Sequence, residues 1–74
     1  DMERADLNGV IIKDVKWNNC SLKDAKLQNV KMSQFDLSNN KIVEMLIEAD
    51  LSNADWKDVP ETIKNKILNK KGKL

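Results

Sequence analysis

The sequence predicts an all-β solenoid, a parallel β-helix in which coils of chain stack on one another, closed at its C-terminal end by an α-helix. Apolar residues recur every five positions, turn-forming residues fill the gaps between them, and the spacing becomes helical near the C-terminus. The length of 74 residues allows one domain. We divide it into a β-helix, residues 1–58, and a capping helix with a basic tail, residues 59–74.

The central series of the repeat begins at Leu7 and takes every fifth residue as far as Ile47. All of its members are apolar, although only 41% of the chain is apolar. Steps of five form no face on an α-helix and alternate between the two faces of a continuous strand. Short extended pieces must therefore be separated by turns. The predicted inward core consists of Leu7, Ile12, Trp17, Leu22, Leu27, Met32, Leu37, Ile42, Ile47, Leu51 and Trp56.

The residues between the apolar positions are turn formers. Asn8-Gly9, Lys23-Asp24 and Gln28-Asn29 each follow a central apolar residue, and Asn, Asp and Gly favour the backbone conformations of tight turns. An extended piece followed by a turn, repeated in one sense, gives a closed coil. Stacked coils pair their backbones in a parallel ladder.

Several of these units follow the pattern A-D/N-L-x-x. The matches are Ala5-Asp6-Leu7-Asn8-Gly9, Ala49-Asp50-Leu51-Ser52-Asn53 and Ala54-Asp55-Trp56-Lys57-Asp58, with variants at Cys20-Ser21-Leu22-Lys23-Asp24 and Phe35-Asp36-Leu37-Ser38-Asn39. Over residues 1–59 the chain resembles the pentapeptide-repeat proteins. The resemblance implies a right-handed quadrilateral parallel β-helix of about three coils, with roughly 20 residues in each.

The resemblance also implies which residues stack. Leu7, Leu27 and Ile47 are expected to share one face, and Trp17, Leu37 and Trp56 another. The repeat slips by one residue between Ile42 and Leu51, so either Ile47 or Leu46 points inward there. We place Ile47 inward, because the alternative would also bury the carboxylate of Glu44 at a high cost in free energy.

The two ends of the chain differ. Met2 holds the central position of a repeat whose first residues would precede it, which suggests a piece of a longer protein. At the other end the spacing predicts a helix over 59–71, with an N-cap at Asp58 and a stop at Gly72. Its lysines suit the negative pole of a helix. The residues expected to cover the last coil are Ile63, Ile67 and Leu68.

The sequence contains few residues that could form a catalytic or metal-binding site. The single cysteine, Cys20, has no histidine to activate it because the chain contains none. The aspartates lie at turns or at the outward position before each central residue, as solvated surface. We therefore predict no catalytic, cofactor-binding or metal site in this segment, and leave open an enzyme, such as a ubiquitin ligase, elsewhere in the parent protein.

A protein partner is the expected ligand, because stacked coils offer flat faces and no pocket for a small-molecule substrate. The predicted contact residues are Ile11, Val43 and Leu46, which are apolar at outward positions. The resemblance points to the substrate-binding segment of a secreted bacterial effector, such as a HECT-like ubiquitin ligase. It leaves open a DNA mimic that binds gyrase and confers quinolone resistance, and a structural spacer between domains.

The distribution of charge and the hydropathy of the chain indicate which partners and which cellular compartment to expect. Residues 1–60 hold eight Lys/Arg and eleven Asp/Glu, a net charge of −3, whereas residues 61–74 hold five Lys and one Glu, a net charge of +4. The basic tail has no aromatic residue to stack on a base, so nucleic acid is not an expected partner. No apolar run is long enough to span a membrane. We expect the bacterial cytoplasm, or the cytosol of a host cell after secretion.

Overall fold

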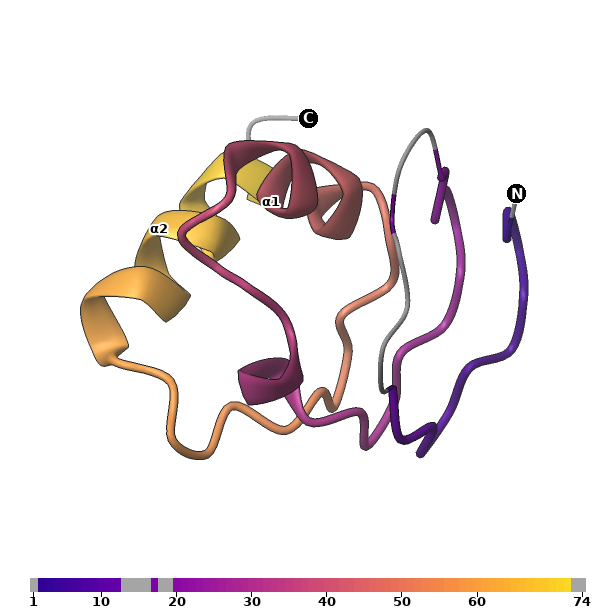
Figure 1. The fold of residues 1–74 in the computed structure, drawn as a ribbon, viewed down its shortest axis with the longest axis horizontal. Coiled ribbons are helices and arrows are strands. Elements are labelled where there is room, and N and C mark those ends of the chain that lie inside the picture. The colour runs from indigo at the N-terminus through magenta and orange to yellow at the C-terminus, as the bar shows by residue number, and fades with distance from the viewer. Residues whose placement is uncertain (1, 13–16, 18–19, 73–74) are drawn as a thin grey trace.

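A computed structural model describes residues 2–12, 17 and 20–72 (Figure 1). These residues form a short 3-10 helix, η1 (Met32–Gln34), and two α-helices, α1 (Asn40–Ile47) and α2 (Glu61–Gly72). The predicted all-β solenoid is wrong. The described part of the chain contains no β-strand and no sheet, and its parallel pairing consists of isolated bridges.

Reverse turns explain why no strand forms among the residues that the structure describes. Turns close at residues 2–5, 7–10, 22–25 and 27–30, where the last N–H donates to the first carbonyl at 2.9–3.1 Å. The third residue of each has a positive φ, as in type II turns. A turn of four residues in a repeat of five leaves a single extended residue between turns, such as Asp6. Pairing therefore stops at one bridge and does not lengthen into a strand.

Gly9 is expected to matter for its backbone conformation alone. Its φ is +69°, and an added Cβ would meet nothing within 4 Å. Gly9→Ala should therefore destabilise the protein by about 1 kcal/mol through left-handed strain, and lower the Tm by about 4–8 °C in thermal unfolding followed by circular dichroism. Gly9→Asn is the matched control, since Asn29 and Asn53 adopt the same φ. Equal Tm values for Gly9→Ala and wild type would contradict the turn.

Three segments lie side by side in register, and we name them the first layer (residues 2–12), the second layer (21–32) and the third layer (48–56) (Figure 1). Lys26 donates its N–H to the Ala5 carbonyl and accepts from the Leu7 N–H, both at 2.9 Å. Asp50 donates in the same way to the Ala25 carbonyl at 2.7 Å. The described chain is thus a stack of turns joined by main-chain hydrogen bonds.

The spacing between layers is unequal. Asp6 pairs with Lys26, 20 residues on, whereas Lys26 pairs with Asp50, 24 residues on. Consequently the residue beside Leu27 in the third layer is Leu51 and not Ile47. The predicted stacking of Ile47 on Leu27 is wrong. The extra residues belong to the longer path through α1.

Helix α1 replaces the predicted repeats around Ile42 and Ile47. The Asn39 side chain caps it by accepting from the N–H groups of Lys41 and Ile42, at 2.9 and 3.4 Å. Helical spacing buries both Leu46 and Ile47, so the choice between them does not arise. Asn40 begins the helix and is exposed.

The core is apolar, and no polar or charged residue in the described part of the chain is buried. Each predicted inward residue lies in this core or packs against it, Trp17 and Trp56 being partly buried. The predicted place of Trp56 in one column with Trp17 and Leu37 is wrong, however. Trp56 lies beside Met32 of the second layer, whose N–H donates to the Asp55 carbonyl at 2.8 Å. The Trp17 ring lies 5.8 Å from that of Phe35.

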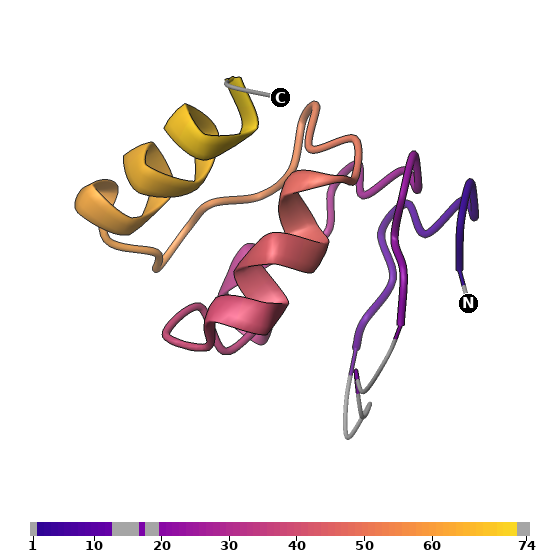
Figure 2. The same ribbon diagram turned by 90° about the horizontal axis from the view of Figure 1, so that it is seen from above.

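Helix α2 lies against α1, at the end of the molecule away from the first layer (Figures 1 and 2). It begins at Glu61 and extends to Gly72, where a helix over 59–71 was expected. Asp58 is not its N-cap, because Asp58 has a φ of +68° inside the preceding turn. Ile67 is buried, whereas Leu68 is exposed and does not cover the core as expected.

Candidate protein-contact surface

Two of the three predicted contact residues are unavailable to a partner. Val43 is 5% exposed and Leu46 is 0% exposed, because α1 turns both of them toward the core. The expectation that they face outward is wrong. Ile11, by contrast, is 76% exposed, and its neighbour Val10 is 36% exposed. The exposed apolar surface of the first layer therefore centres on Val10 and Ile11.

The Gln34 side chain holds the segment that carries Ile11. Its Oε1 accepts from the Ile12 N–H at 2.6 Å, while its Nε2 donates to the Val10 and Lys31 carbonyls at 3.5 and 3.1 Å. The 3-10 helix η1 occupies the place where main-chain pairing would otherwise continue. Gln34 substitutes for that pairing and fixes the backbone on both sides of Ile11. The sequence carries no signal for this role, since Gln34 lies outside the central apolar series.

The outer edge of the first layer is uncovered by any described segment (Figure 1). Met2, Leu7 and Ile12 are half-buried there. Their counterparts in the second layer, Leu22, Leu27 and Met32, are all completely buried. The difference arises because the second layer has a neighbour on each side and the first layer has one. The first layer thus presents apolar side chains that a further segment would cover.

Main-chain groups at this edge alternate in direction. The Ala5 carbonyl and the Leu7 N–H bond to the second layer. The N–H and C=O of Asp6, which lies between them, must therefore point the other way. No described residue bonds to either group. The edge offers one donor and one acceptor in register with the half-buried Met2 and Leu7.

The outward aspartates are bound to the backbone, a role that the sequence reasoning missed. The Asp6 Oδ1 accepts from the Asn8 N–H at 3.1 Å, and the Asp36 Oδ1 accepts from the Ser38 N–H at 3.2 Å. Asp50 and Asp55 bond in the same way to the residue two positions on. The signal was present, since Asp two positions before a turn residue is the mark of an Asx-turn. These carboxylates fix the turns while remaining at the surface.

The turn bond lowers the pKa of the Asp50 carboxyl. The hydrogen bond from the Ser52 backbone N–H holds the pKa of the Asp50 carboxyl below its ordinary value, and the Ser52 side chain and the nearby charges of Lys71 and Lys26 act in the same direction. The carboxylate therefore stays charged to lower pH than in an unfolded chain.

The basic residues of α2 serve the fold at two points. The Lys71 Nζ donates to the Ile47 carbonyl at 3.1 Å and to the Ala49 carbonyl. It thereby satisfies the last carbonyl of α1, which has no partner within its own helix. The Lys64 Nζ lies 6.0 Å from the centre of the Trp56 ring, within range of a cation–π contact. Lys66 and Lys70 line a cavity of about 190 Å³ between the two helices.

Cys20 is free and partly buried, and its thiol contacts the Ser21 carbonyl at 3.9 Å. Within the described residues no group of three or more potential ligands is placed to hold a metal ion. No described helix is both long and apolar enough to cross a membrane.

Turns of one length, stacked in register, define a repeat protein. The chain belongs to the pentapeptide-repeat family, whose model matches residues 1–39 with 8 copies of the repeat. The match stops immediately before α1, at the cap residue Asn39. The units at 49–58 lie outside the matched part, although they form the same turns. No curated protein and no solved structure matches the chain.

Proposed function

We propose that this chain is a protein–protein interaction module whose contact surface is formed by Val10 and Ile11 beside the open edge of the first layer. The single observation that carries the proposal is the exposure of Ile11, at 76%, on a backbone segment that the Gln34 side chain holds in place. A large apolar side chain on a fixed backbone loses little conformational freedom on binding. Such residues are common anchors at the centre of interfaces.

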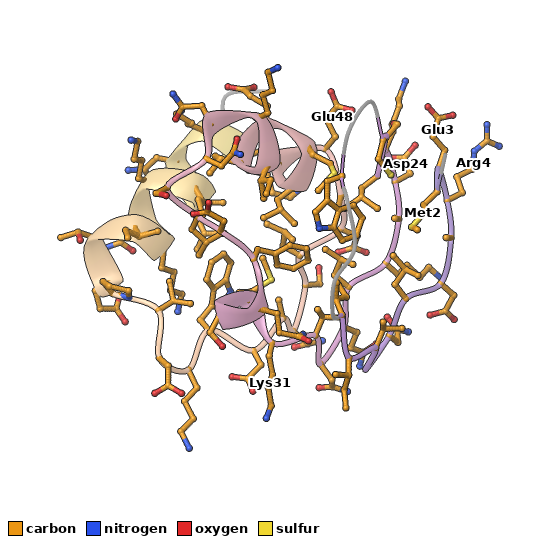
Figure 3. All side chains as sticks on the ribbon, in the orientation of Figure 1. Met2, Glu3, Arg4, Asp24, Lys31 and Glu48 are labelled. Carbon is orange, nitrogen blue, oxygen red and sulfur yellow. The ribbon has the colours of Figure 1, made fainter. Side chains whose placement is uncertain are left out.

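The charges around this surface suit a protein partner. Arg4, Asp24 and Glu48 lie on the first, second and third layers (Figure 3). Both signs of charge are therefore present at the surface of the stack, and polar and charged residues form the rim of protein interfaces. In the longer protein proposed from the sequence, the module would bind the substrate of a bacterial effector, such as a HECT-like ubiquitin ligase. The gyrase-binding mimic is the weaker proposal, because the extents of 28 × 24 × 21 Å are nearly equal and the described residues form no long acidic axis.

The test compares capture by the wild-type chain and by Ile11→Asp. The immobilised chain would be incubated with bacterial and eukaryotic lysates side by side, and each captured protein identified, purified and titrated against the variants. Ile11→Asp should weaken binding by at least about tenfold, since it places a charge at the centre of the contact. Its fold should be unchanged, because Ile11 contributes little buried area.

Leu68→Asp is the control for this test, since Leu68 is also an exposed large apolar residue but lies on α2, away from the first layer. It should bind the partner as the wild type does. Equal affinities of wild type and Ile11→Asp for every purified protein would overturn the proposal and support a structural spacer. A bacterial topoisomerase as the Ile11-dependent partner would favour the mimic.

A further inference from the structure

The cavity of about 190 Å³ lies between α1 and α2, which pack side by side (Figure 2). The sequence predicts no pocket, because the stacked turns of a solenoid offer flat faces. The walls of this cavity come from the two helices and from the residues immediately before α1. The helix that replaces the expected repeats, together with α2, thus creates a concave site that the five-residue pattern does not contain.

One face of α2 supplies half of the lining. Ile63, Lys66, Ile67 and Lys70 follow one another at intervals of three, one and three residues, so they share a face of the helix, and all four line the cavity. A helix face that packs against a neighbour is ordinarily apolar. Here two of the four residues are lysines. Neither ammonium group makes a hydrogen bond or an ion pair with a described residue.

The charge of these two lysines is not balanced by the other residues of the lining. No described carboxylate lines the cavity, and the first turn of α1, which begins here at Asn40, contains no acidic residue. The positive end of the α1 dipole therefore adds to the charge of the lysines. The Ser38 hydroxyl also lines the cavity but already donates to the Asp36 Oδ1 at 2.5 Å.

Lys66 and Lys70 differ in this respect from the other described lysines of the same helix. Lys64 lies over the Trp56 ring and Lys71 donates to main-chain carbonyls, so both stabilise the fold. Lys66 and Lys70 have no such contact. Their ammonium groups and the Asn40 side-chain amide are the donors that the cavity offers to a ligand.

The rest of the lining is apolar. Val43 and Ile67 are 5% and 1% exposed, and Leu37 and Ile63 are half-buried. An apolar cavity of about 150 Å³ admits a benzene ring, so a cavity of 190 Å³ admits a ring or a branched alkyl group that carries one carboxylate. Inorganic phosphate would match the charge but would leave the apolar side chains facing water.

We propose that the cavity between α1 and α2 binds a small organic anion, a carboxylate whose apolar part is about the size of a benzene ring. Lys66 and Lys70 hold the carboxylate, and the apolar part packs against Ile67. This inference goes beyond the proposed function, because the cavity is formed by the two helices and the first layer contributes no residue to it.

Three probes separate charge from shape. Benzoate, benzyl alcohol and inorganic phosphate would each be titrated into the ¹⁵N-labelled chain. Benzoate should give saturable shifts of the Asn40, Val43 and Ile67 amide signals. Benzyl alcohol, which has the ring without the charge, should bind at least about fivefold more weakly, because two ion pairs at the surface are lost. Phosphate, which has the charge without the ring, should also bind at least about fivefold more weakly.

A double variant, Lys66→Met with Lys70→Met, isolates the two charges. Methionine keeps most of the side-chain length, and Lys66 is exposed and Lys70 half-buried, so the fold should be unchanged by circular dichroism. The double variant should bind benzoate no more tightly than benzyl alcohol. Lys64→Met is the matched control, since Lys64 lies on the same helix but faces Trp56. It should keep the wild-type preference for benzoate.

Several results would overturn the inference. These are equal binding of benzoate and benzyl alcohol to the wild-type chain, phosphate binding as tight as that of benzoate, an undiminished preference for benzoate in the double variant, and shifts confined to residues outside the cavity. None of them affects the proposed function, whose test depends on Ile11 in the first layer. An Ile11-dependent partner together with any of these results would leave the proposed function standing while the inference fails.

Discussion

The Leu27→Asp variant is expected to be unfolded at 25 °C. Leu27 is 0% exposed and lies in the second layer, with a neighbouring layer on each side. The substitution removes a packed side chain, which costs about 2–5 kcal/mol, and places a carboxylate where no charged partner is available, which costs several kcal/mol more. A chain of this length is stable by about 4–11 kcal/mol, so the two effects together remove most or all of its stability.

Circular dichroism and the dispersion of amide signals would measure the loss. Gln28→Asp is the matched control, because Gln28 is the exposed neighbour of Leu27 and its backbone N–H, which donates to the Asn8 Oδ1 at 2.9 Å, is unchanged. The control should retain the wild-type free energy of unfolding within about 0.5 kcal/mol. A Leu27→Asp protein that melts like the wild type would show that this position faces solvent.

The Leu46→Ala variant should lose about 2–5 kcal/mol of unfolding free energy, because it leaves a cavity beneath a completely buried side chain of α1. In a domain of this size each kcal/mol corresponds to about 4–8 °C, so the Tm should fall by about 10 °C or more. This prediction separates the observed helix from the five-residue repeat expected here, in which Leu46 faces outward.

Chemical and thermal unfolding would measure the loss for Leu46→Ala. The control, measured in parallel, is Glu44→Ala, which alters an exposed residue of the same helix. Glu44→Ala should change the free energy of unfolding by less than about 0.5 kcal/mol. If both variants were equally mild, the burial of Leu46 would be contradicted and an outward position at Leu46 restored.

Part of the candidate site was predictable. Ile11 could be placed on the surface because it precedes an inward residue in the five-residue pattern, and it is exposed. Leu46 occupies the same position in the pattern and Val43 another outward position, yet both are buried. A pattern position determines exposure only where the repeat persists, and α1 interrupts the repeat. The bonds of Gln34 join residues more than 20 positions apart, so no local pattern reveals them.

Where the five-residue repeat persists, the sequence by itself determined which side chains face inward and where the chain turns. Gly9 and Asn29 mark turns that need a positive φ, and an apolar residue every fifth position has to share one interior with the others. These properties depend on a few adjacent residues, so they can be predicted without knowing the fold.

Only the tertiary structure decided the path of residues 40–47 and the register that follows from it. Ile42 and Ile47 fit a five-residue repeat and also lie on the buried side of a helix, so local spacing does not distinguish the two. The choice is made by the Asn39 cap, by the burial of Leu46, and by the bond from Lys71 to the last carbonyl of α1. The last of these exists only once α2 packs against α1, because Lys71 lies 24 residues along the chain from Ile47.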